Sequence, residues 1–315
     1  MRTPGDYPTP KFSDPNDERF VKLVRRGNVP ARNSVNIVGI PFDGAVLGRK
    51  GASEGPGAIR QATASFSNYD AQSDVSLNEG RIVDLGDVTG LSDDVLKSHN
   101  TIEEELAEAY VDGSLLVALG GDNSVSLPCL KAFAGKFRRI GLIVIDSHLD
   151  LRGEIGGKPT SGSSYGLAVR SIRGLPPTRV VEVGHHGFLN SKSYIQTARK
   201  MGIELVGADE VAARGAKAVA EEAYRKASRG AEAVYLSIDL DAVDLASVSG
   251  VSAPSSGGIS SRELFEMAFE IARRDKVKGA DIVELAPSLD PTGRSQLVAA
   301  TVLVHLVGGF VSRSA

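Results

Sequence analysis

The chain has 315 residues, of which 42% are hydrophobic and 24% are charged, and its formal net charge is −3. This composition is typical of an ordinary globular protein, and no basic run marks a nucleic-acid surface. The single cysteine, Cys129, excludes an internal disulfide and indicates a reducing, cytoplasmic setting in which it is a small core residue. We find no signal peptide and no apolar stretch long enough to span a membrane, so neither nucleic acid nor membrane is an expected partner.

The first 33 residues are rich in Pro, Asp, Lys and Arg, and they predict an N-terminal arm that could pack on a neighbouring subunit. Residues 34–315 show no break in composition and predict one domain. Short apolar runs predict eight strands, at 35–40, 81–85, 114–119, 140–145, 179–183, 203–206, 233–238 and 280–285. Stretches of helical periodicity lie between most of them, at 93–111, 124–134, 190–201, 209–229, 260–273 and 295–307.

Strands that are apolar throughout and alternate with helices are typical of an α/β fold with a mostly parallel sheet covered on both faces. Polar residues follow the ends of these strands: residues 41–43 after the first, 120–124 after the third and 184–186 after the fifth, while Glu284 ends the eighth. Ligands bind outside the carboxyl ends of parallel strands. One converging site is therefore expected at that edge of the sheet.

The most informative stretch directly follows the apolar run 140–145. Asp146, His148 and Asp150 stand at alternate positions, and in an extended backbone such side chains point to one side. A second pair, Asp239 and Asp241, follows the run 233–238. A lone Asp-x-Asp pair is usually turn chemistry, but two such clusters at the ends of two buried strands predict a metal site.

The four aspartates of this cluster carry a charge of −4, which one divalent ion reduces to −2 and two ions neutralise. Two divalent ions per subunit are therefore expected, because buried like charges are unstable without compensation. Carboxylate and imidazole ligands without a thiolate suit manganese, magnesium, nickel or zinc, and such ion pairs support hydrolysis. Asp244 is expected to support its loop, whereas His185 and His186 allow both a metal-binding role and a plain polar-loop role.

These motifs resemble the ureohydrolase family, which includes arginase, agmatinase and formimidoylglutamase. Residues 39–43 and 51–60 resemble the family's opening signature, and Gly120-Gly-Asp-Asn-Ser124 resembles its Gly-Gly-Asp-His-Ser motif. Residues 146–150 resemble Asp-Ala-His-x-Asp, and residues 237–244 resemble Ser-x-Asp-x-Asp-x-x-Asp. The resemblance covers nearly the whole chain. It implies a three-layer α/β/α sandwich with an eight-stranded sheet, a centre of two ions, usually manganese, and a trimeric or hexameric homo-oligomer.

By position, the resemblance implies that Asp146 and Asp239 bridge the two ions. His148 and Asp241 would complete the shell of one ion, and Asp150 and Asn123 would complete the shell of the other. Glu284 aligns with a glutamate that holds the cationic nitrogen group of the substrate. A carboxylate suits that role because it pairs well with a planar amidinium, although support of a neighbouring ligand is the plainer alternative.

Two positions depart from the family pattern. Asn123 stands where arginases and agmatinases have a histidine ligand, and an amide oxygen binds a hard ion more weakly, so that ion position is expected to be labile or empty. Tyr165 stands where arginase-like members have a histidine that assists proton transfer. A tyrosine pKa of about 10 makes it a poor shuttle at neutral pH. Asp150 or a water on the metal would then deliver the proton.

Arg152 and the segment Ser161–Tyr165 resemble the formimidoylglutamase branch. N-formimidoylglutamate carries two carboxylates and an amidine, and Arg152 could bind one carboxylate in bidentate fashion. The expected substrate site also includes Ser161, Ser163, Ser164 and Tyr165. The cationic tail of agmatine would be repelled by Arg152. An ion pair between Arg152 and Glu154 or the nearby aspartates is an equally open alternative.

The leading hypothesis is a binuclear-metal hydrolase of a linear amidine C–N bond, namely a formimidoylglutamase that converts N-formimidoyl-L-glutamate and water into L-glutamate and formamide. An agmatinase-like enzyme acting on a guanidino compound is the first alternative. A catalytically silent paralogue with a weakened metal site is the second, and Asn123 and Tyr165 motivate it. A dinucleotide-dependent dehydrogenase is disfavoured, because no Gly-x-Gly-x-x-Gly follows a strand.

Overall fold

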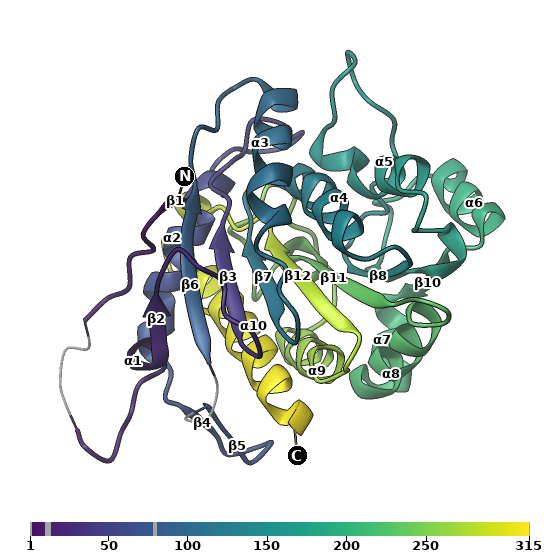
Figure 1. The fold of residues 1–315 in the computed structure, drawn as a ribbon. Helices are drawn as coiled ribbons and strands as arrows, with labels where there is room; N and C mark the ends of the chain where they lie inside the picture. The colour runs from purple at the N-terminus through teal and green to yellow at the C-terminus, as the bar shows by residue number, and fades with distance from the viewer. Residues whose placement is uncertain (1, 10–13, 78–80, 315) are drawn as a thin grey trace.

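A twisted, mostly parallel sheet runs through the centre of the molecule in the computed structural model, which describes residues 2–9, 14–77 and 81–314 (Figure 1). Across these residues the strand order is β1-β6-β3-β7-β12-β11-β8-β9-β10, with β2 also paired to β6. All eight strands expected from the sequence are present and run parallel to one another: β3 (Val35–Gly39), β6 (Ile82–Val88), β7 (Leu115–Leu119), β8 (Ile140–Ile145), β9 (Val180–His185), β10 (Glu204–Gly207), β11 (Ala233–Asp239) and β12 (Val277–Val283).

Two short strands from the N-terminal segment bring the described part of this sheet to ten, where eight were expected. β1 (Arg2–Thr3) pairs antiparallel with β6, and β2 (Val24–Arg26) pairs parallel with it. Strands of two or three residues show no readable hydrophobic period. The N-terminal segment packs against the body of its own chain. Tyr7 is buried there and donates a hydrogen bond to Asp84 at 2.6 Å. A separate hairpin joins β4 (Tyr69–Asp70) to β5 (Val75–Ser76).

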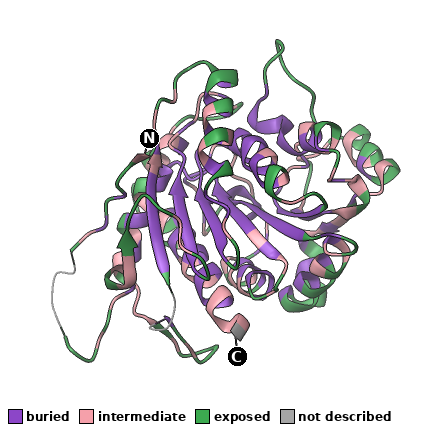
Figure 2. Ribbon diagram, viewed as in Figure 1, coloured by how far each residue is buried: buried purple, intermediate pink, exposed green. Residues whose placement is uncertain are grey.

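Helices cover both faces of the sheet, which confirms the three-layer sandwich (Figures 1 and 2). Alternate strand residues point to opposite faces. In β8, Ile143 and Ile145 join one core cluster, whereas Leu142 and Val144 join the other. The first face carries α2 (Gly55–Ala62), α7 (Ala208–Arg214), α8 (Ala216–Ala227), α9 (Ser261–Ala272) and α10 (Arg294–Val311). The second face carries α3 (Val95–Ala107), α4 (Ser126–Lys136), α5 (Ser164–Ser171) and α6 (Lys192–Met201).

Some helix predictions need correction. The single helix expected at 209–229 is two helices, α7 and α8, because Gly215 between them has a φ of 86° that a right-handed helix does not permit. The helices α2 and α5, and the one-turn helix α1 (Phe20–Leu23), were not expected. Each has eight residues or fewer, which is too short for a clear amphipathic period.

By length and composition, α10 is the one helix of the described residues that could cross a membrane. This corrects the expectation that no apolar stretch is long enough. However, 56% of α10 is buried inside the structure, where it packs against α9 and α2. The apolar composition of α10 is therefore accounted for by the core that it covers.

Candidate active site

Four adjacent strands bring the expected site residues to one edge of the sheet. In sheet order, β7, β12, β11 and β8 lead at their carboxyl ends into Asn123, Glu284, Asp239 and Asp146, respectively. The turn after β7 requires a close backbone approach at Gly121, where a Cβ atom would lie 1.6 Å from the carbonyl oxygen of Phe42. The same glycine accepts a hydrogen bond from the backbone N–H of Glu284 at 2.8 Å. The loops that carry the site are therefore packed directly against each other.

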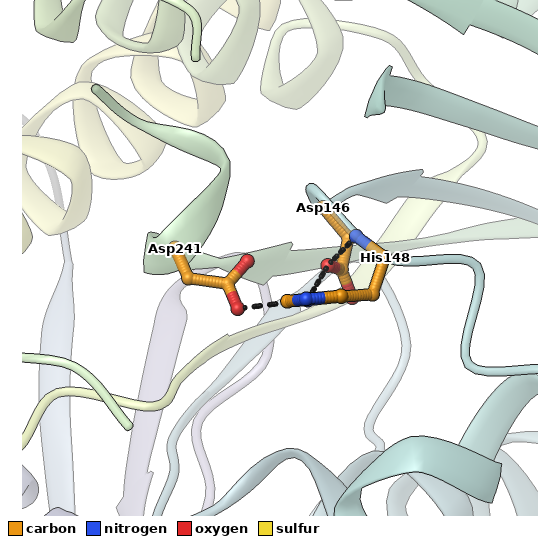
Figure 3. A group of neighbouring side chains, drawn as sticks. All are labelled: Asp146, His148 and Asp241. Atoms are coloured by element: carbon orange, nitrogen blue, oxygen red, sulfur yellow. Dashed lines mark hydrogen bonds and ion pairs between the residues drawn. The ribbon is translucent and has the colours of Figure 1, made fainter. Parts of the chain in front are cut away.

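Asp146, His148 and Asp241 form a compact group of metal-ligand type (Figure 3). One ligand atom of each lies within 4.8 Å of the other two. The Nδ1 atom of His148 lies 3.0 Å from Oδ2 of Asp241 and 3.6 Å from Oδ1 of Asp146. Burial opposes a charge on His148, but the two aspartates outweigh it and raise its pKa to about 11. Without an ion, the imidazole thus acts as the local counter-cation.

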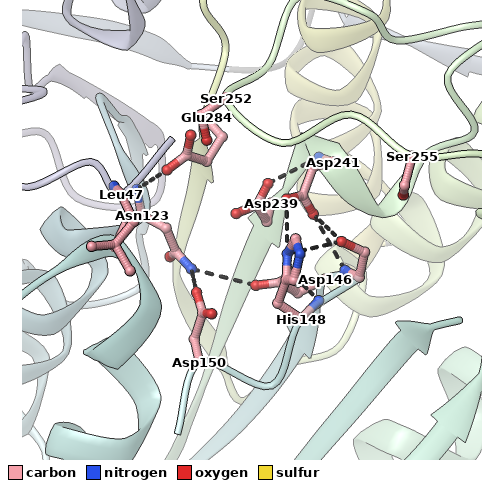
Figure 4. A network of polar contacts seen from close by, with 12 residues as sticks. Leu47, Asn123, Asp146, His148, Asp150, Asp239, Asp241, Ser252, Ser255 and Glu284 are labelled. Carbon is pink, nitrogen blue, oxygen red and sulfur yellow. Dashed lines mark hydrogen bonds and ion pairs between the residues drawn. The ribbon is translucent and has the colours of Figure 1, made fainter. Parts of the chain in front are cut away.

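Asp239 lies beside this group on the side of Asn123, and both Asp239 and Asp146 are 2% exposed (Figure 4). Burial, reinforced by the charge of Asp241, raises the pKa of each well above its usual range. Among the ion pairs of the described residues, His148 is the only cation that contacts Asp146 or Asp241. Carboxylates and imidazole are suitable donors for divalent ions, and buried, mutually repelling carboxylates require such compensation. The residues present therefore fit a divalent metal ion.

The other side of the cluster contains Asn123 and Asp150. The side-chain amino group of Asn123 donates to Oδ2 of Asp150 at 2.6 Å and to Oδ2 of Asp146 at 3.3 Å. The amide presents its nitrogen to the aspartates and its oxygen to the Ser126 and Tyr165 hydroxyls. Burial raises the pKa of Asp150 to about 7, although the charge of His148 opposes this shift.

Two site carboxylates stand on unusual backbone. Asp150 has a φ of 44° and Glu284 has a φ of 71°, values in the left-handed region that favours glycine. The surrounding structure holds both: Gly166 N donates to the carbonyl oxygen of Asp150 at 3.0 Å, and Glu284 Oε1 accepts from Asn123 N at 2.7 Å. Burial, followed by the charge of Asp122, raises the pKa of Glu284 to about 8.

A cavity of about 140 Å³ opens above the cluster. Arg152 is part of its wall, and the Arg152 guanidinium lies 5.7 Å from the centre of the Tyr194 ring. Ser161 also lines the cavity, and its hydroxyl accepts from Leu47 N at 3.0 Å. The lining residues are Leu47, Gly48, Asn123, His148, Asp150, Arg152, Ser161, Gly162, Asp239, Asp241, Ser252, Ala253 and Glu284.

Ser163, Ser164 and Tyr165 lie behind this wall and are completely buried. The Ser163 hydroxyl donates to the carbonyl oxygen of Thr160 at 2.9 Å, and the Ser164 hydroxyl donates to that of Asn123 at 2.7 Å. The Tyr165 hydroxyl contacts Oδ1 of Asn123 at 3.0 Å. In this structure their hydroxyls hold the wall together and do not face the cavity.

Sequence reasoning missed Asn190, which holds the loop that carries Asp146, His148 and Asp150. Its Oδ1 accepts from Leu149 N at 3.0 Å, and its Nδ2 donates to the carbonyl oxygen of Ser147 at 2.8 Å, so it bonds the peptide groups on both sides of His148. Its location after β9 in a Gly-Phe-Leu-Asn-Ser segment was the only available signal. Separately, the Asp244 carboxylate accepts from the backbone N–H groups of Ala246 and Gly257 at 2.8 and 2.7 Å, which supports its loop.

Comparison with known proteins yields a consistent picture. A family model described as the arginase family matches residues 33–308. A formimidoylglutamase of Halobacterium salinarum is 36% identical over 311 residues, covering 96% of this chain and 97% of that protein. The crystal structure of formimidoylglutamase from Bacillus subtilis superimposes with a TM-score of 0.89 at 27% identity, covering 96% of this chain and 94% of that one. A structure of Trypanosoma cruzi formiminoglutamase with Mn²⁺ gives a TM-score of 0.85 at 28% identity, covering 94% and 99%.

Proposed function

This chain belongs to the arginase family and is a hydrolase of C–N bonds, and from this premise we propose that it is a formimidoylglutamase. The proposed reaction converts N-formimidoyl-L-glutamate and water into L-glutamate and formamide. The observation that carries the choice of substrate is Arg152, which lines the cavity beside the aspartate cluster. A guanidinium pairs well with a carboxylate of the substrate and would repel the cationic tail of agmatine. The similarity to formimidoylglutamases supports the same choice.

The proposed centre holds two divalent ions, with manganese the favoured metal. His148 and Asp241 would hold one ion, Asp150 and Asn123 would hold the other, and Asp146 and Asp239 would contact both. The burial and mutual repulsion of these aspartates support the proposal, because two ions would neutralise them. When bound, such ions supply Lewis-acid activation of the amidine and of water.

The remaining chemistry is assigned to the protein's own side chains. Glu284 would orient the amidinium, and Arg152 would fix a carboxylate of the glutamate moiety, so that the formimino carbon lies over the cluster. Water adds to that carbon, and the bond from the carbon to the glutamate nitrogen breaks. Asp150 would accept one proton from the water and return it to the departing nitrogen, and the remaining hydroxyl proton would pass to the freed amine, leaving neutral formamide and glutamate with a protonated amino group.

Tyr165 is excluded from this proton transfer by its position. Its hydroxyl is buried behind Asn123, and burial raises its pKa well above the usual value. Ser161 is proposed to contact the substrate from the cavity wall, whereas Ser163 and Ser164 would act by holding that wall.

The orientation of Asn123, whose amino group faces Asp150, favours one alternative, a paralogue with a weakened metal site. Purified, manganese-loaded protein should be assayed against N-formimidoylglutamate, arginine, agmatine and guanidinobutyrate, with metal content measured in parallel. We expect turnover of the formimino compound and two ions per subunit. Turnover of a guanidino compound with none of the formimino compound would contradict the substrate assignment. No turnover, together with well under two ions per subunit, would support the weakened paralogue.

A further inference from the structure

The side-chain amide of Asn123 lies between two different sets of polar atoms. On one side, its Nδ2 donates to the carboxylates of Asp150 and Asp146 (Figure 4). On the other side, its Oδ1 lies 3.0 Å from both the Tyr165 hydroxyl and the Ser126 hydroxyl. Which end of the amide faces the aspartates decides whether Asn123 offers them a hydrogen-bond donor or offers an ion a ligand.

A chain of hydroxyls stands behind the amide. The Tyr165 and Ser126 hydroxyls lie 3.0 and 3.3 Å from the Ser237 hydroxyl, which donates to Oδ1 of Asp281 at 2.6 Å. The second oxygen of Asp281 accepts from the Tyr235 hydroxyl at 3.0 Å. All five side chains are completely buried. We call Tyr165, Ser126 and Ser237 the hydroxyl relay.

The relay can accommodate either end of the amide, because each hydroxyl has one proton and two acceptor sites. When Oδ1 faces the relay, Tyr165 and Ser126 donate to it. When the amide is turned by 180°, its two N–H groups donate to Tyr165 and Ser126, and these hydroxyls donate in turn to Ser237. In both arrangements Ser237 donates to Asp281. The turned amide would place its oxygen against Asp150, which is repulsive unless a cation lies between them.

We propose that Tyr165 and Ser126 are positioning residues that hold the turned amide of Asn123, and that they thereby set the affinity of the Asn123 side of the centre for a divalent ion. The inference rests on the two-ion centre proposed above. Without an ion, the amino group partly compensates Asp150 and Asp146; with an ion, the oxygen faces it and the amino group faces the relay. Asn123 and Tyr165, the two departures from the family pattern, thus form one unit.

The two arrangements respond unequally to loss of the Tyr165 hydroxyl. The amide oxygen keeps one donor, Ser126, when it faces the relay. The turned amino group has two N–H groups but only one remaining acceptor, so one buried donor is left unsatisfied. An unsatisfied buried donor is far less favourable than a carbonyl with a single partner. Tyr165→Phe is therefore expected to weaken ion binding on the Asn123 side about tenfold.

The test is a Mn²⁺ titration of the full, chelator-stripped protein, with free Mn²⁺ followed by electron paramagnetic resonance. Tyr165→Phe is compared with the control Tyr235→Phe. The control also removes one phenolic hydroxyl from a completely buried tyrosine, but on the other side of Asp281. We expect the weaker of two ions to lose about tenfold in affinity in Tyr165→Phe, with the tighter ion unchanged. Both affinities should stay unchanged in Tyr235→Phe.

The same comparison in an Asn123→His background supplies a second criterion. An imidazole has no amide to turn, so Tyr165→Phe should have no effect on ion affinity there. The inference would be overturned by any of three results: an unchanged affinity for the more weakly bound ion in Tyr165→Phe, an equal loss of affinity for both ions, or the same loss of affinity in Tyr235→Phe. If Tyr165→Phe does not fold, Ser126→Ala removes the other acceptor and is judged by the same outcomes. A wild-type protein that binds fewer than two Mn²⁺ ions would instead overturn the two-ion centre itself.

Discussion

Glu182 in β9 offers a sharp test of how this fold treats buried charge. It is 1% exposed, and neither of its carboxylate oxygens has a hydrogen-bond partner among the described residues. Burial, followed by the charges of Asp146 and Asp150, raises its pKa well above the usual value. Burial therefore favours the protonated, neutral form of the side chain in the folded protein, whereas the carboxyl ionises readily in the unfolded chain. Glu182→Gln keeps the size of the side chain and removes the titration.

The sign follows from proton linkage. Above the unfolded pKa of about 4.5, the folded state holds a proton that the unfolded chain has released, so the free energy of unfolding falls as pH rises. The fall continues up to the raised folded pKa, at about 1.4 kcal/mol per pH unit. Over the part of the interval from pH 5.5 to 7.5 that lies below the folded pKa, this group removes up to about 1.4 kcal/mol per pH unit from the wild type. Glu182→Gln should therefore become more stable relative to the wild type as pH rises over the same interval.

The assay is urea unfolding of both proteins at the two pH values, with chelator present so that ions do not alter the neighbouring aspartates. Any pH-independent effect of the substitution cancels in the comparison. Glu204→Gln is the matched control, because Glu204 lies on the adjacent strand β10 but is exposed and paired with Lys226. A stability difference between Glu182→Gln and the wild type that is the same at both pH values would refute the reasoning.

Three further outcomes are expected. Arg152→Met should raise the KM for N-formimidoylglutamate by about tenfold or more, as expected for a lost charged hydrogen bond. The control Arg173→Met, at an exposed arginine, should leave the KM unchanged. Equal KM values for Arg152→Met and the wild type would exclude Arg152 from carboxylate binding. Arg60→Met should lower the free energy of unfolding by about 3–5 kcal/mol, because it leaves buried Asp84 without the cation now 2.7 Å away; a urea-unfolding loss below about 1 kcal/mol would contradict this. Chelation should lower the thermal midpoint and added Mn²⁺ restore it, and identical midpoints in calorimetry would argue against a metal centre.

The sequence was sufficient where one short segment decides the outcome. β8 was located at 140–145 because every residue in it is apolar, and Asp146, His148 and Asp150 could be placed at the candidate site because they directly follow it. The strands β1 and β2 were missed because their two or three residues form only by pairing with β6.

Contacts between distant segments could not be read from the sequence. The amide of Asn123 faces Asp150 with its nitrogen because it donates to carboxylates 23 and 27 residues away. In the same way, Ser163 and Ser164 have suitable hydroxyls for a substrate but point into the wall, since Thr160 and Asn123 supply closer acceptors. Side-chain direction and amide orientation depend on packing that no local pattern encodes.

The left-handed backbone at Asp150 and Glu284 has a consequence for anyone who improves this protein by selection. Glycine at either position would relieve an unfavourable conformation, each worth on the order of 1–3 kcal/mol. A library screened only for heat resistance should therefore enrich glycine at these two codons and yield robust but inert molecules. A position at which a substitution raises stability but abolishes turnover is one where natural selection has favoured activity over stability.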